Sequence, residues 1–411
     1  MSSGPIPAKG SPLPAGAFEV GREVFAADPS FPLALLRDSA LVSNSASMMR
    51  FCREHGASLA PHGKTTMSPE LIRRQLADGA WAITAASAWQ ARMMHLSGVR
   101  RILLANEVVV PAELRWLAEA RHDGLDVFLY VDSSAGVAIA DEALSGYPPS
   151  WTLPVLVEIG TPGGRGGVRS AHDALAVAEA ASRSSRLRLI GVAGFEGILG
   201  PTDQRSAEEV VSTFLGEIVE AAHLIDARGW FDPDSEIIVS AGGSAYFDYV
   251  VGAFAQLRLR RAPRVVLRAG CYLTHDHGSL DEASPLGATP RVEGTQLRPA
   301  VEVWAAVLSR PEPNRAIVGA GKRDVSTDGL LPVVVKHRPR RTGQIADVTP
   351  RRITAVNDQH AFLDLESTDP LAVGDLVCLG ISHPCTTFDQ WRSMPVVDDQ
   401  YRVTEVITTL F

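Results

Sequence analysis

The chain of 411 residues lacks any run of about 18 consecutive apolar residues, the length that a membrane-spanning helix requires. It also lacks an excess of positive charge. Its net charge of −8 at pH 7 argues against a nucleic acid or an anionic membrane as the main partner. Its four cysteines, Cys52, Cys271, Cys378 and Cys385, are too few and too scattered for a disulfide framework. Since the N-terminus also lacks the apolar core of a signal peptide, we expect a cytoplasmic protein that acts on a small molecule.

Most of the chain has the composition of a globular protein with a large core, with 45% hydrophobic and 21% charged residues. After a lead-in rich in proline and glycine over residues 1–16, short apolar runs alternate with segments of helical periodicity. Eight such runs favour a (β/α)8 barrel of the TIM type over an open doubly wound sheet. The predicted strands are 57–61, 81–85, 101–105, 126–131, 153–159, 189–194, 236–240 and 264–267. Helices are predicted after Pro69, after Pro111 and after the capping box of Ser206 and Glu209.

The helical periodicity ends near residue 290, and short strands separated by turn residues follow. The predicted strands are 301–307, 316–318, 332–335, 353–356, 362–365, 376–379 and 403–407. We therefore predict a barrel over residues 45–290 and a separate all-β domain over residues 291–411. The segment 17–44 fits neither pattern, so by its own sequence it could pack on either domain.

Lys64 is the first candidate for catalysis. The predicted strand ends at Pro61 and Gly63, and Ser68 and Pro69 begin a helix, so Lys64 lies in a loop at the carboxyl end of a barrel strand, where barrel active sites form. A partly desolvated lysine can lose its proton and form a Schiff base with a cofactor aldehyde. The alternative is an ordinary solvated lysine.

Three other predicted strands end in loops rich in glycine. Five glycines surround Arg165, and the seventh and eighth strands end in Ser240-Ala-Gly-Gly-Ser244 and Arg268-Ala-Gly-Cys-Tyr272. The loops after the seventh and eighth strands form the characteristic phosphate site of such barrels, because small residues let backbone N–H groups converge on the anion. Ordinary glycine-rich turns are the alternative.

A candidate metal site lies in the β domain, where His383 and Cys385 follow a predicted strand. Imidazole and thiolate are preferred ligands of Zn²⁺, and two protein ligands leave positions open for a substrate oxygen. A buried thiol beside a surface histidine is the alternative. His275, Asp276 and His277 form a second candidate cluster, for which a solvated loop is an equal interpretation.

Taken together, the motifs from Pro61 to Thr66, Ser240 to Ser244, Arg268 to Tyr272 and Ser382 to Trp391 resemble the family of D-serine dehydratases and D-threonine aldolases. The resemblance runs from about residue 20 to the C-terminus. It implies the alanine racemase type of fold, in which a barrel that binds pyridoxal phosphate precedes a β domain that also includes the N-terminal segment. It also implies a homodimer.

The resemblance also assigns roles to residues. Lys64 would be the Schiff-base lysine, and His383 and Cys385 would bind Zn²⁺ or another divalent metal. The residues expected to bind the cofactor are Lys64, Arg165, Ser240, Gly242, Gly243, Ser244, Gly270 and Tyr272. Family members often carry tyrosine and histidine around the position of Phe195-Glu196-Gly197, so the partner of the pyridine nitrogen stays unassigned.

Aldolases of this family typically have aspartate at the position of Cys385, so the thiolate favours a dehydratase. We therefore predict a lyase that depends on pyridoxal phosphate and a divalent metal and converts a β-hydroxy D-amino acid, D-serine above all, to a 2-oxo acid and ammonia. Retro-aldol cleavage to glycine and an aldehyde is the first alternative. A racemase, with Tyr272 as a second base, and a cofactor-binding protein without turnover are the others.

Overall fold

The computed structural model describes residues 8–12 and 17–411, so most of the predicted lead-in over residues 1–16 lies outside the described residues. The chain forms two compact units. The barrel unit comprises Met48–Lys64 and Arg74–Gly270, and the β unit comprises Met1–Ser47, Thr65–Arg73 and Cys271–Phe411.

The barrel unit contains a row of eight parallel strands, counted within the described residues, in the order β2-β9-β8-β7-β6-β5-β4-β3. The first and last strands of this row are also joined, because the N–H of Trp81 donates to the carbonyl of Leu59 (2.7 Å) and the N–H of Thr84 to that of Pro61 (2.9 Å). The predicted β/α barrel is thus confirmed. The strands are β2 (Ser58–Leu59), β3 (Ile83–Ala85), β4 (Arg101–Glu107), β5 (Asp126–Val131), β6 (Leu153–Ile159), β7 (Leu187–Gly194), β8 (Ile238–Ala241) and β9 (Arg264–Leu267).

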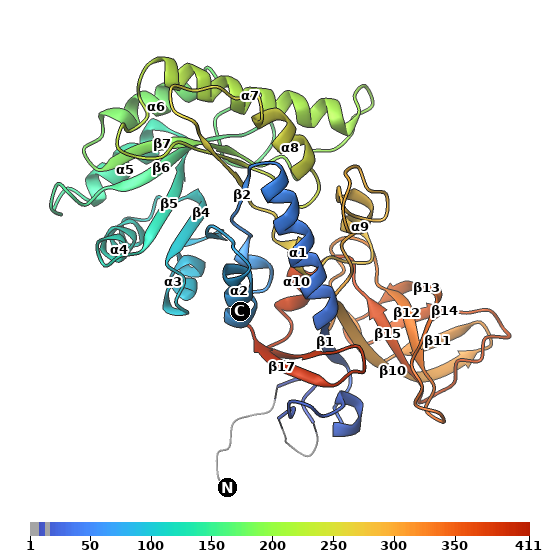
Figure 1. Ribbon diagram of the computed structural model, residues 1–411. Helices are drawn as coiled ribbons and strands as arrows, with labels where there is room; N and C mark the ends of the chain where they lie inside the picture. Colours follow the sequence, from blue (N-terminus) through green and yellow to red (C-terminus); the bar gives the residue numbers. More distant parts are fainter. Residues whose placement is uncertain (1–7, 13–16) are drawn as a thin grey trace, which may run out of the picture. The chain divides into compact units, whose positions relative to one another are not determined.

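Helices connect successive strands of the barrel, and Figure 1 shows α3 to α7 outside the strands. The predicted capping box is present, since the Ser206 hydroxyl and the Glu209 carboxylate satisfy the first N–H groups of α7. Side chains such as Leu103, Leu156 and Ile190 fill the inside of the barrel. The helices are α2 (Pro69–Ala77), α3 (Ala88–Leu96), α4 (Pro111–His122), α5 (Ser134–Ala143), α6 (Ala174–Arg183), α7 (Ala207–Ala227) and α8 (Phe247–Phe254).

The described residues of the β unit form a sheet in the order β11-β14-β13-β12-β15-β10-β1-β16-β17. Because β10 also pairs with β11, six antiparallel strands close into a ring, and Figure 1 shows β10 to β15 grouped together. The predicted all-β domain is therefore confirmed. Its strands are β1 (Leu33–Arg37), β10 (Val301–Glu312), β11 (Arg315–Val318), β12 (Val333–Arg338), β13 (Ala346–Val356), β14 (Ala361–Asp364), β15 (Leu376–Gly380), β16 (Ser393–Val397) and β17 (Val403–Thr408).

Two of these strands, β1 and β16, were not predicted from the sequence. The strand β1 pairs with β10 and β16, so a segment near the N-terminus completes the sheet. The helix α1 (Asp38–Glu54) follows β1 directly, and α9 (Ser279–Ala283) and α10 (Cys385–Phe388) are short. The 3-10 turns found in the described part of the chain are η1 (Val24–Ala27), η2 (Gly63–Thr65) and η3 (Cys271–Leu273).

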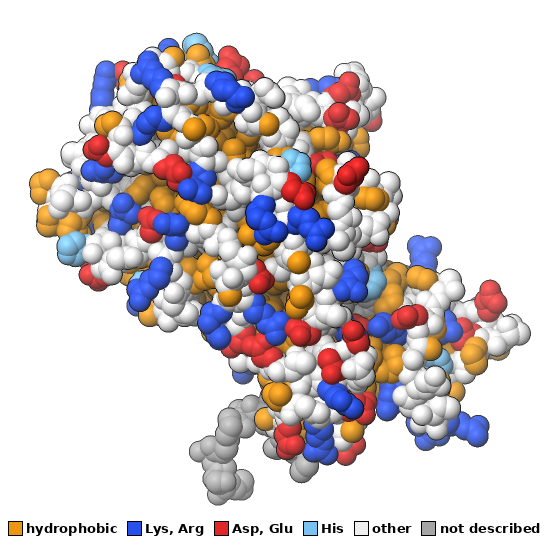
Figure 2. All heavy atoms as spheres, viewed as in Figure 1, with side chains coloured by type: hydrophobic (Ala, Val, Ile, Leu, Met, Phe, Trp, Pro, Cys, Tyr) orange, Lys and Arg blue, Asp and Glu red, His pale blue; other side chains and the backbone are white. Residues whose placement is uncertain are grey.

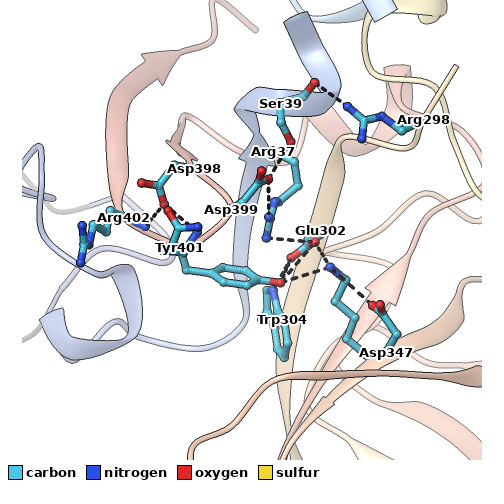
Figure 3. Close-up of polar contacts among 12 residues, drawn as sticks. Arg37, Ser39, Arg298, Glu302, Trp304, Asp347, Asp398, Asp399, Tyr401 and Arg402 are labelled. Atoms are coloured by element: carbon cyan, nitrogen blue, oxygen red, sulfur yellow. Dashed lines mark hydrogen bonds and ion pairs between the residues drawn. The ribbon is translucent and has the colours of Figure 1, made fainter. Parts of the chain in front are cut away.

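A buried carboxylate holds β1 in this sheet. Figure 3 shows Arg37 of β1 and the hydroxyl of Tyr401 directed at Glu302 of β10. The Tyr401 hydroxyl and the indole N–H of Trp304 donate to Glu302 at 3.1 and 2.8 Å, and the amine of Lys336 lies 3.0 Å from it. Because breaking such a buried pair leaves an unpaired charge, losing Glu302 would cost about 3 to 5 kcal/mol.

On the face drawn in Figure 2, positive and negative side chains are interspersed with apolar ones. Among the helices of the described residues, none is both long and apolar enough to span a bilayer.

Candidate active site

Lys64 lies in the turn η2, which begins shortly after the first barrel strand ends at Leu59. The turn needs glycine before the lysine, because a Cβ on Gly63 would lie 2.6 Å from the Met94 side chain and 2.8 Å from that of Ile83. Lys64 is half-buried, and its amine makes no hydrogen bond or ion pair with any residue that the structure describes. The amine is therefore available for bonding to another molecule.

His62 stands two residues before Lys64. Burial lowers the pKa of this histidine well below its usual value, and the charges of Lys64, Arg268 and Arg165 lower it further. Its Nδ1 atom is buried and has no hydrogen-bond partner among the described residues. A neutral imidazole with an unsatisfied nitrogen thus lies beside the candidate lysine.

The glycine-rich loop after β8 has the backbone shape that was expected of a tight turn. Gly242 has φ +93°, which favours glycine, and the Ser240 hydroxyl donates to the carbonyl of Val266. The N–H groups of Gly242 and Gly243, however, donate to the fully buried carboxylate of Glu196 at 3.0 and 2.5 Å. The two amides nearest the turn are therefore occupied by a side chain that sequence reasoning did not assign.

Arg268, at the end of β9, is a second residue without a predicted role. Its guanidinium is buried, and it donates to the Ser240 hydroxyl (2.7 Å) and the Gly194 carbonyl (2.6 Å). Both of these acceptors are neutral, so neither hydrogen bond pairs the guanidinium with a carboxylate. The sequence feature that could have predicted a role for Arg268 is its position directly after an apolar strand.

Arg165, a predicted cofactor residue, lies in the exposed loop after β6. Its guanidinium stacks on the ring of Phe195 at 4.5 Å. The contact fixes this arginine against the residue that precedes Glu196 in the chain.

A pair of carboxylates lies at the ends of β4 and β6. A Cβ on Gly166 would lie 3.0 Å from one oxygen of Glu107 and 3.0 Å from one of Glu158. Burial, a hydrogen bond with Glu158 and the charges of Glu158 and Asp132 raise the pKa of Glu107 to about 8. The pair therefore holds a proton at neutral pH.

The remaining predicted residues of the eighth-strand loop fall on both sides of a unit boundary. Gly270 is the last residue of the barrel unit, whereas Tyr272 belongs to the β unit, in the turn η3, and is 1% exposed.

The β unit brings together the sulfur atoms of Cys271 and Cys385 and a ring nitrogen of His383. These three atoms all lie within 4.8 Å of one another, and the two sulfurs are 3.5 Å apart. Sequence reasoning had grouped Cys271 with the phosphate loop. The sequence feature that could have identified Cys271 as a ligand is its position as a second cysteine at a strand end. The residues present thus fit a divalent metal with soft ligands.

The close contacts within this group shift the pKa values of its members. Hydrogen bonds from Cys271 and His383 lower the pKa of the Cys385 thiol to about 4, whereas the Cys385 contact raises the pKa of His383 to about 9. The same contact and burial raise the pKa of Cys271. Thr65, the residue after Lys64 in the chain, places its hydroxyl 3.4 Å from the Cys385 sulfur and 3.7 Å from that of Cys271.

In the second predicted ligand cluster, His275 and Asp276 have structural partners, whereas the buried Nδ1 of His277 has no hydrogen-bond partner among the described residues. His275 contacts the Asp281 carboxylate at 3.2 Å, and Asp276 accepts hydrogen bonds from the N–H groups of Gly278, Leu280 and Asp281. Within the described residues these side chains are not part of the ligand group.

Comparison with known proteins gives a family model, described as a putative serine dehydratase domain, that matches residues 300–397. A D-threonine aldolase from an Arthrobacter species is 26% identical over 385 residues, which are 91% of this chain and 92% of the relative. D-threo-3-hydroxyaspartate dehydratase from a Delftia species is 29% identical over 247 residues, 60% of this chain and 61% of that enzyme.

Solved structures extend the comparison. The D-threonine aldolase of Filomicrobium marinum matches 95% of this chain and 97% of its own, with a TM-score of 0.76 and 24% identity. The metal-free form of a D-threo-3-hydroxyaspartate dehydratase with one cysteine changed to alanine matches 93% and 97%, with a TM-score of 0.70 and 23% identity. Another variant of that dehydratase has a histidine changed, two positions before that cysteine. An alanine racemase-like protein shares the same fold. The resemblance is therefore confirmed: the chain carries a serine dehydratase-type domain and is related to D-threonine aldolases and hydroxyaspartate dehydratases with the alanine racemase type of fold.

Proposed function

We propose that this protein is a lyase that depends on pyridoxal phosphate and a divalent metal and dehydrates D-serine to pyruvate and ammonia. One observation carries the proposal. The hydroxyl of Thr65 lies within 3.7 Å of both cysteine sulfurs of the ligand group, and Lys64 is the preceding residue of the same turn. The candidate Schiff-base lysine is thus the chain neighbour of a residue that contacts both candidate sulfur ligands.

The chain offers suitable groups for the cofactor. Lys64 has a half-buried amine without a partner among the described residues, and His62 beside it is neutral. Arg268 supplies a buried positive charge whose hydrogen-bond acceptors are neutral groups. Pyridoxal phosphate, when bound, provides an aldehyde that condenses with an amine and a ring that stabilises negative charge at Cα. Lys64 would bind the cofactor at rest and take the Cα proton of the substrate during the reaction.

The phosphate assignment needs one adjustment. Because Glu196 occupies the N–H groups of Gly242 and Gly243, we propose that these glycines shape the loop while the hydroxyl and backbone of Ser244, with Gly270 and Tyr272, contact the phosphate. Arg165, held against Phe195 at the exposed edge, would contribute positive charge nearby.

The metal ligands explain how a poor leaving group departs. A divalent metal, when bound, stabilises the charge that develops on a departing hydroxide. His383 and Cys385 would hold it, and the released aminoacrylate would hydrolyse to pyruvate and ammonia. The related dehydratase supports this assignment, since its metal-free form has a cysteine changed in a His-x-Cys pair.

Retro-aldol cleavage is the second candidate, because the Arthrobacter relative is a D-threonine aldolase. It differs in where the proton is removed: from the β-hydroxyl rather than from Cα. We favour dehydration because of the thiolate at position 385.

A substrate panel tests the proposal. The purified protein is incubated with D-serine, L-serine, D-threonine and D-threo-3-hydroxyaspartate, and pyruvate, oxaloacetate, ammonia and glycine are assayed separately. We expect pyruvate and ammonia from D-serine and no product from L-serine. Glycine from D-threonine without pyruvate from D-serine would select the aldolase, whereas interconversion of the serine enantiomers alone would select a racemase. We also expect a homodimer by light scattering.

A further inference from the structure

Cys271 is the unexpected member of the ligand group, and the spacing of its sulfur is informative. Two sulfurs bound at about 2.3 Å to one tetrahedral Zn²⁺ lie about 3.8 Å apart. The sulfurs of Cys271 and Cys385 are 3.5 Å apart. A disulfide would require about 2.05 Å. The observed separation is therefore close to that of two thiolates on one ion.

The local structure holds Cys271 in this position. It begins the turn η3, whose next residues, Tyr272 and Leu273, are buried. The N–H of His275 donates to the Cys271 carbonyl at 2.7 Å and closes the turn. The sulfur is thus presented by a fixed backbone rather than by a mobile loop.

A carboxylate orients the imidazole of His383. Its Nδ1 lies 2.9 Å from the Asp328 carboxylate, which also accepts a hydrogen bond from the Thr386 hydroxyl (2.9 Å) and one from Ser326. The other ring nitrogen, Nε2, is left for the ligand group. Metal-bound histidines almost always donate their other ring N–H to a carboxylate, a backbone carbonyl or water, which fixes the ring and increases its basicity.

The two sulfurs share a partner in Thr65, whose hydroxyl lies 3.4 and 3.7 Å from them. A hydroxyl can donate to a thiolate and reduce its charge, as hydrogen-bonded partners do around metal sites. The group therefore has two sulfurs, one imidazole and outer partners for both kinds of ligand.

We propose that Cys271 is a third protein ligand, so that Cys271, His383 and Cys385 form a Cys2His zinc site with one open position. This deepens the proposed function and rests on it only for the use of that position, which would take the β-hydroxyl of the substrate. Three protein ligands and one exchangeable position are the pattern of catalytic zinc. Two thiolates select zinc-like ions over Mg²⁺ and Mn²⁺, which prefer oxygen ligands.

Cobalt(II) provides a test that does not depend on turnover. The full-length protein, reduced and loaded with Co²⁺, should show near-ultraviolet sulfur-to-cobalt absorption whose intensity corresponds to two thiolates. Cys271→Ala and Cys385→Ala should each lose about half of that intensity, and the double variant should lose all of it. Cys52→Ala, which removes a buried cysteine of the barrel unit, is the matched control and should keep the full spectrum.

Zinc retention gives a second readout. We expect Cys271→Ala to lose zinc to a competing chelator at least about tenfold more readily than Cys52→Ala, and Mg²⁺ or Mn²⁺ should not displace the zinc of the unchanged protein. Cys271→Ser checks that the loss comes from the sulfur and not from a cavity.

Several results would overturn the proposal. They are a one-thiolate intensity in the unchanged protein, an undiminished spectrum in Cys271→Ala, and a Cys271–Cys385 disulfide in place of bound metal in freshly reduced protein. Turnover of D-serine with a one-thiolate spectrum would reject the third ligand and keep the lyase. A two-thiolate spectrum without turnover of any β-hydroxy D-amino acid would do the reverse.

Discussion

The strand ends of the barrel unit and the ligand group of the β unit present polar side chains in different ways. In the barrel, each residue follows its own strand, as Lys64 follows β2 and Arg268 follows β9. In the β unit, Cys271 and Cys385 are 114 residues apart in the chain. A parallel barrel gathers its strand ends at one rim whatever their sequence, whereas the ligand group exists only because two remote turns pack together. The first arrangement can be predicted from local patterns, and the second cannot.

The kinds of atom differ as well. The barrel unit gathers oxygen and nitrogen groups, including a buried guanidinium and a carboxylate pair. The β unit gathers two thiols and an imidazole. The two regions therefore suit different tasks, proton and cofactor chemistry in one and a soft metal in the other, and single substitutions should separate these tasks.

The largest effect is expected from Lys64→Ala. Because the amine is proposed both to bind the cofactor and to take the Cα proton, pyruvate formation should fall by at least about 10³-fold, while zinc content stays unchanged. Lys322→Ala, at an exposed position, is the control and should keep full activity. In the unchanged protein, borohydride reduction and peptide mapping should find the pyridoxyl group on Lys64. Label on Lys322 or Lys336 would refute the assignment.

The second effect concerns the metal side of the comparison. Cys385→Ala should lower pyruvate formation by about 10²-fold, the loss expected when charge on a leaving hydroxide is no longer stabilised. The variant should still bind the cofactor and exchange the Cα hydrogen of D-serine with deuterium. Exchange and elimination are followed by NMR in D₂O, with Cys52→Ala as the control. Full pyruvate formation by Cys385→Ala after chelator treatment would leave the metal without a role. Cys385→Asp, a harder ligand, should show some cleavage of D-threonine.

A smaller effect is expected at the glycine loop. A Cβ on Gly243 would lie 2.9 Å from the Phe195 ring and 3.3 Å from a Glu196 oxygen, so Gly243→Val must displace the side chain that holds the loop. Cofactor affinity, measured by fluorescence titration, should fall about tenfold with zinc content unchanged. Gly216→Val, where a Cβ meets nothing within 4 Å, is the matched control. Equal loss of cofactor and zinc would indicate misfolding instead.

The smallest effect is a pH dependence of stability. The folded protein holds the proton of Glu107 with a pKa of about 8, against an ordinary 4.5, so this group's contribution to the free energy of unfolding is lost as the pH rises towards 8. Relative to the unchanged protein, Glu107→Gln should become progressively more stable as the pH rises from 5 to 8, measured by urea unfolding. Glu142→Gln, at an exposed carboxylate, should show no such gain. A constant difference across this range would mean that Glu107 and Glu158 do not share a proton.

Several features of the fold followed from local sequence. The alternation of apolar runs and helical segments predicted the barrel strands, and the capping box at Ser206 marked the start of α7. Strand β1 was not predicted, because its apolar residues carry no sign of their partner. They form a strand only between β10 and β16, where Arg37 reaches the buried Glu302.

The residues of the candidate site also divide into those that local sequence predicts and those that it does not. A few neighbouring residues are enough to predict Lys64, the glycine loops and the His-x-Cys pair as candidates. Strand ends, tight turns and ligand spacing are local properties. Glu196 and Cys271 were not predicted in this way. Glu196 binds the N–H groups of a loop that begins more than 40 residues later in the chain.

The sequence by itself thus determined the order of the elements, the residues at their ends and the types of chemistry that those residues can perform. Tertiary structure alone decided which carboxylate occupies the amides of Gly242 and Gly243, which cysteine joins His383 and Cys385, and which strand Glu302 secures. The physical reason is that hydrogen bonds and metal-type contacts form only below about 4 Å. Whether two distant residues come that close depends on the packing of the elements between them, which no local pattern records.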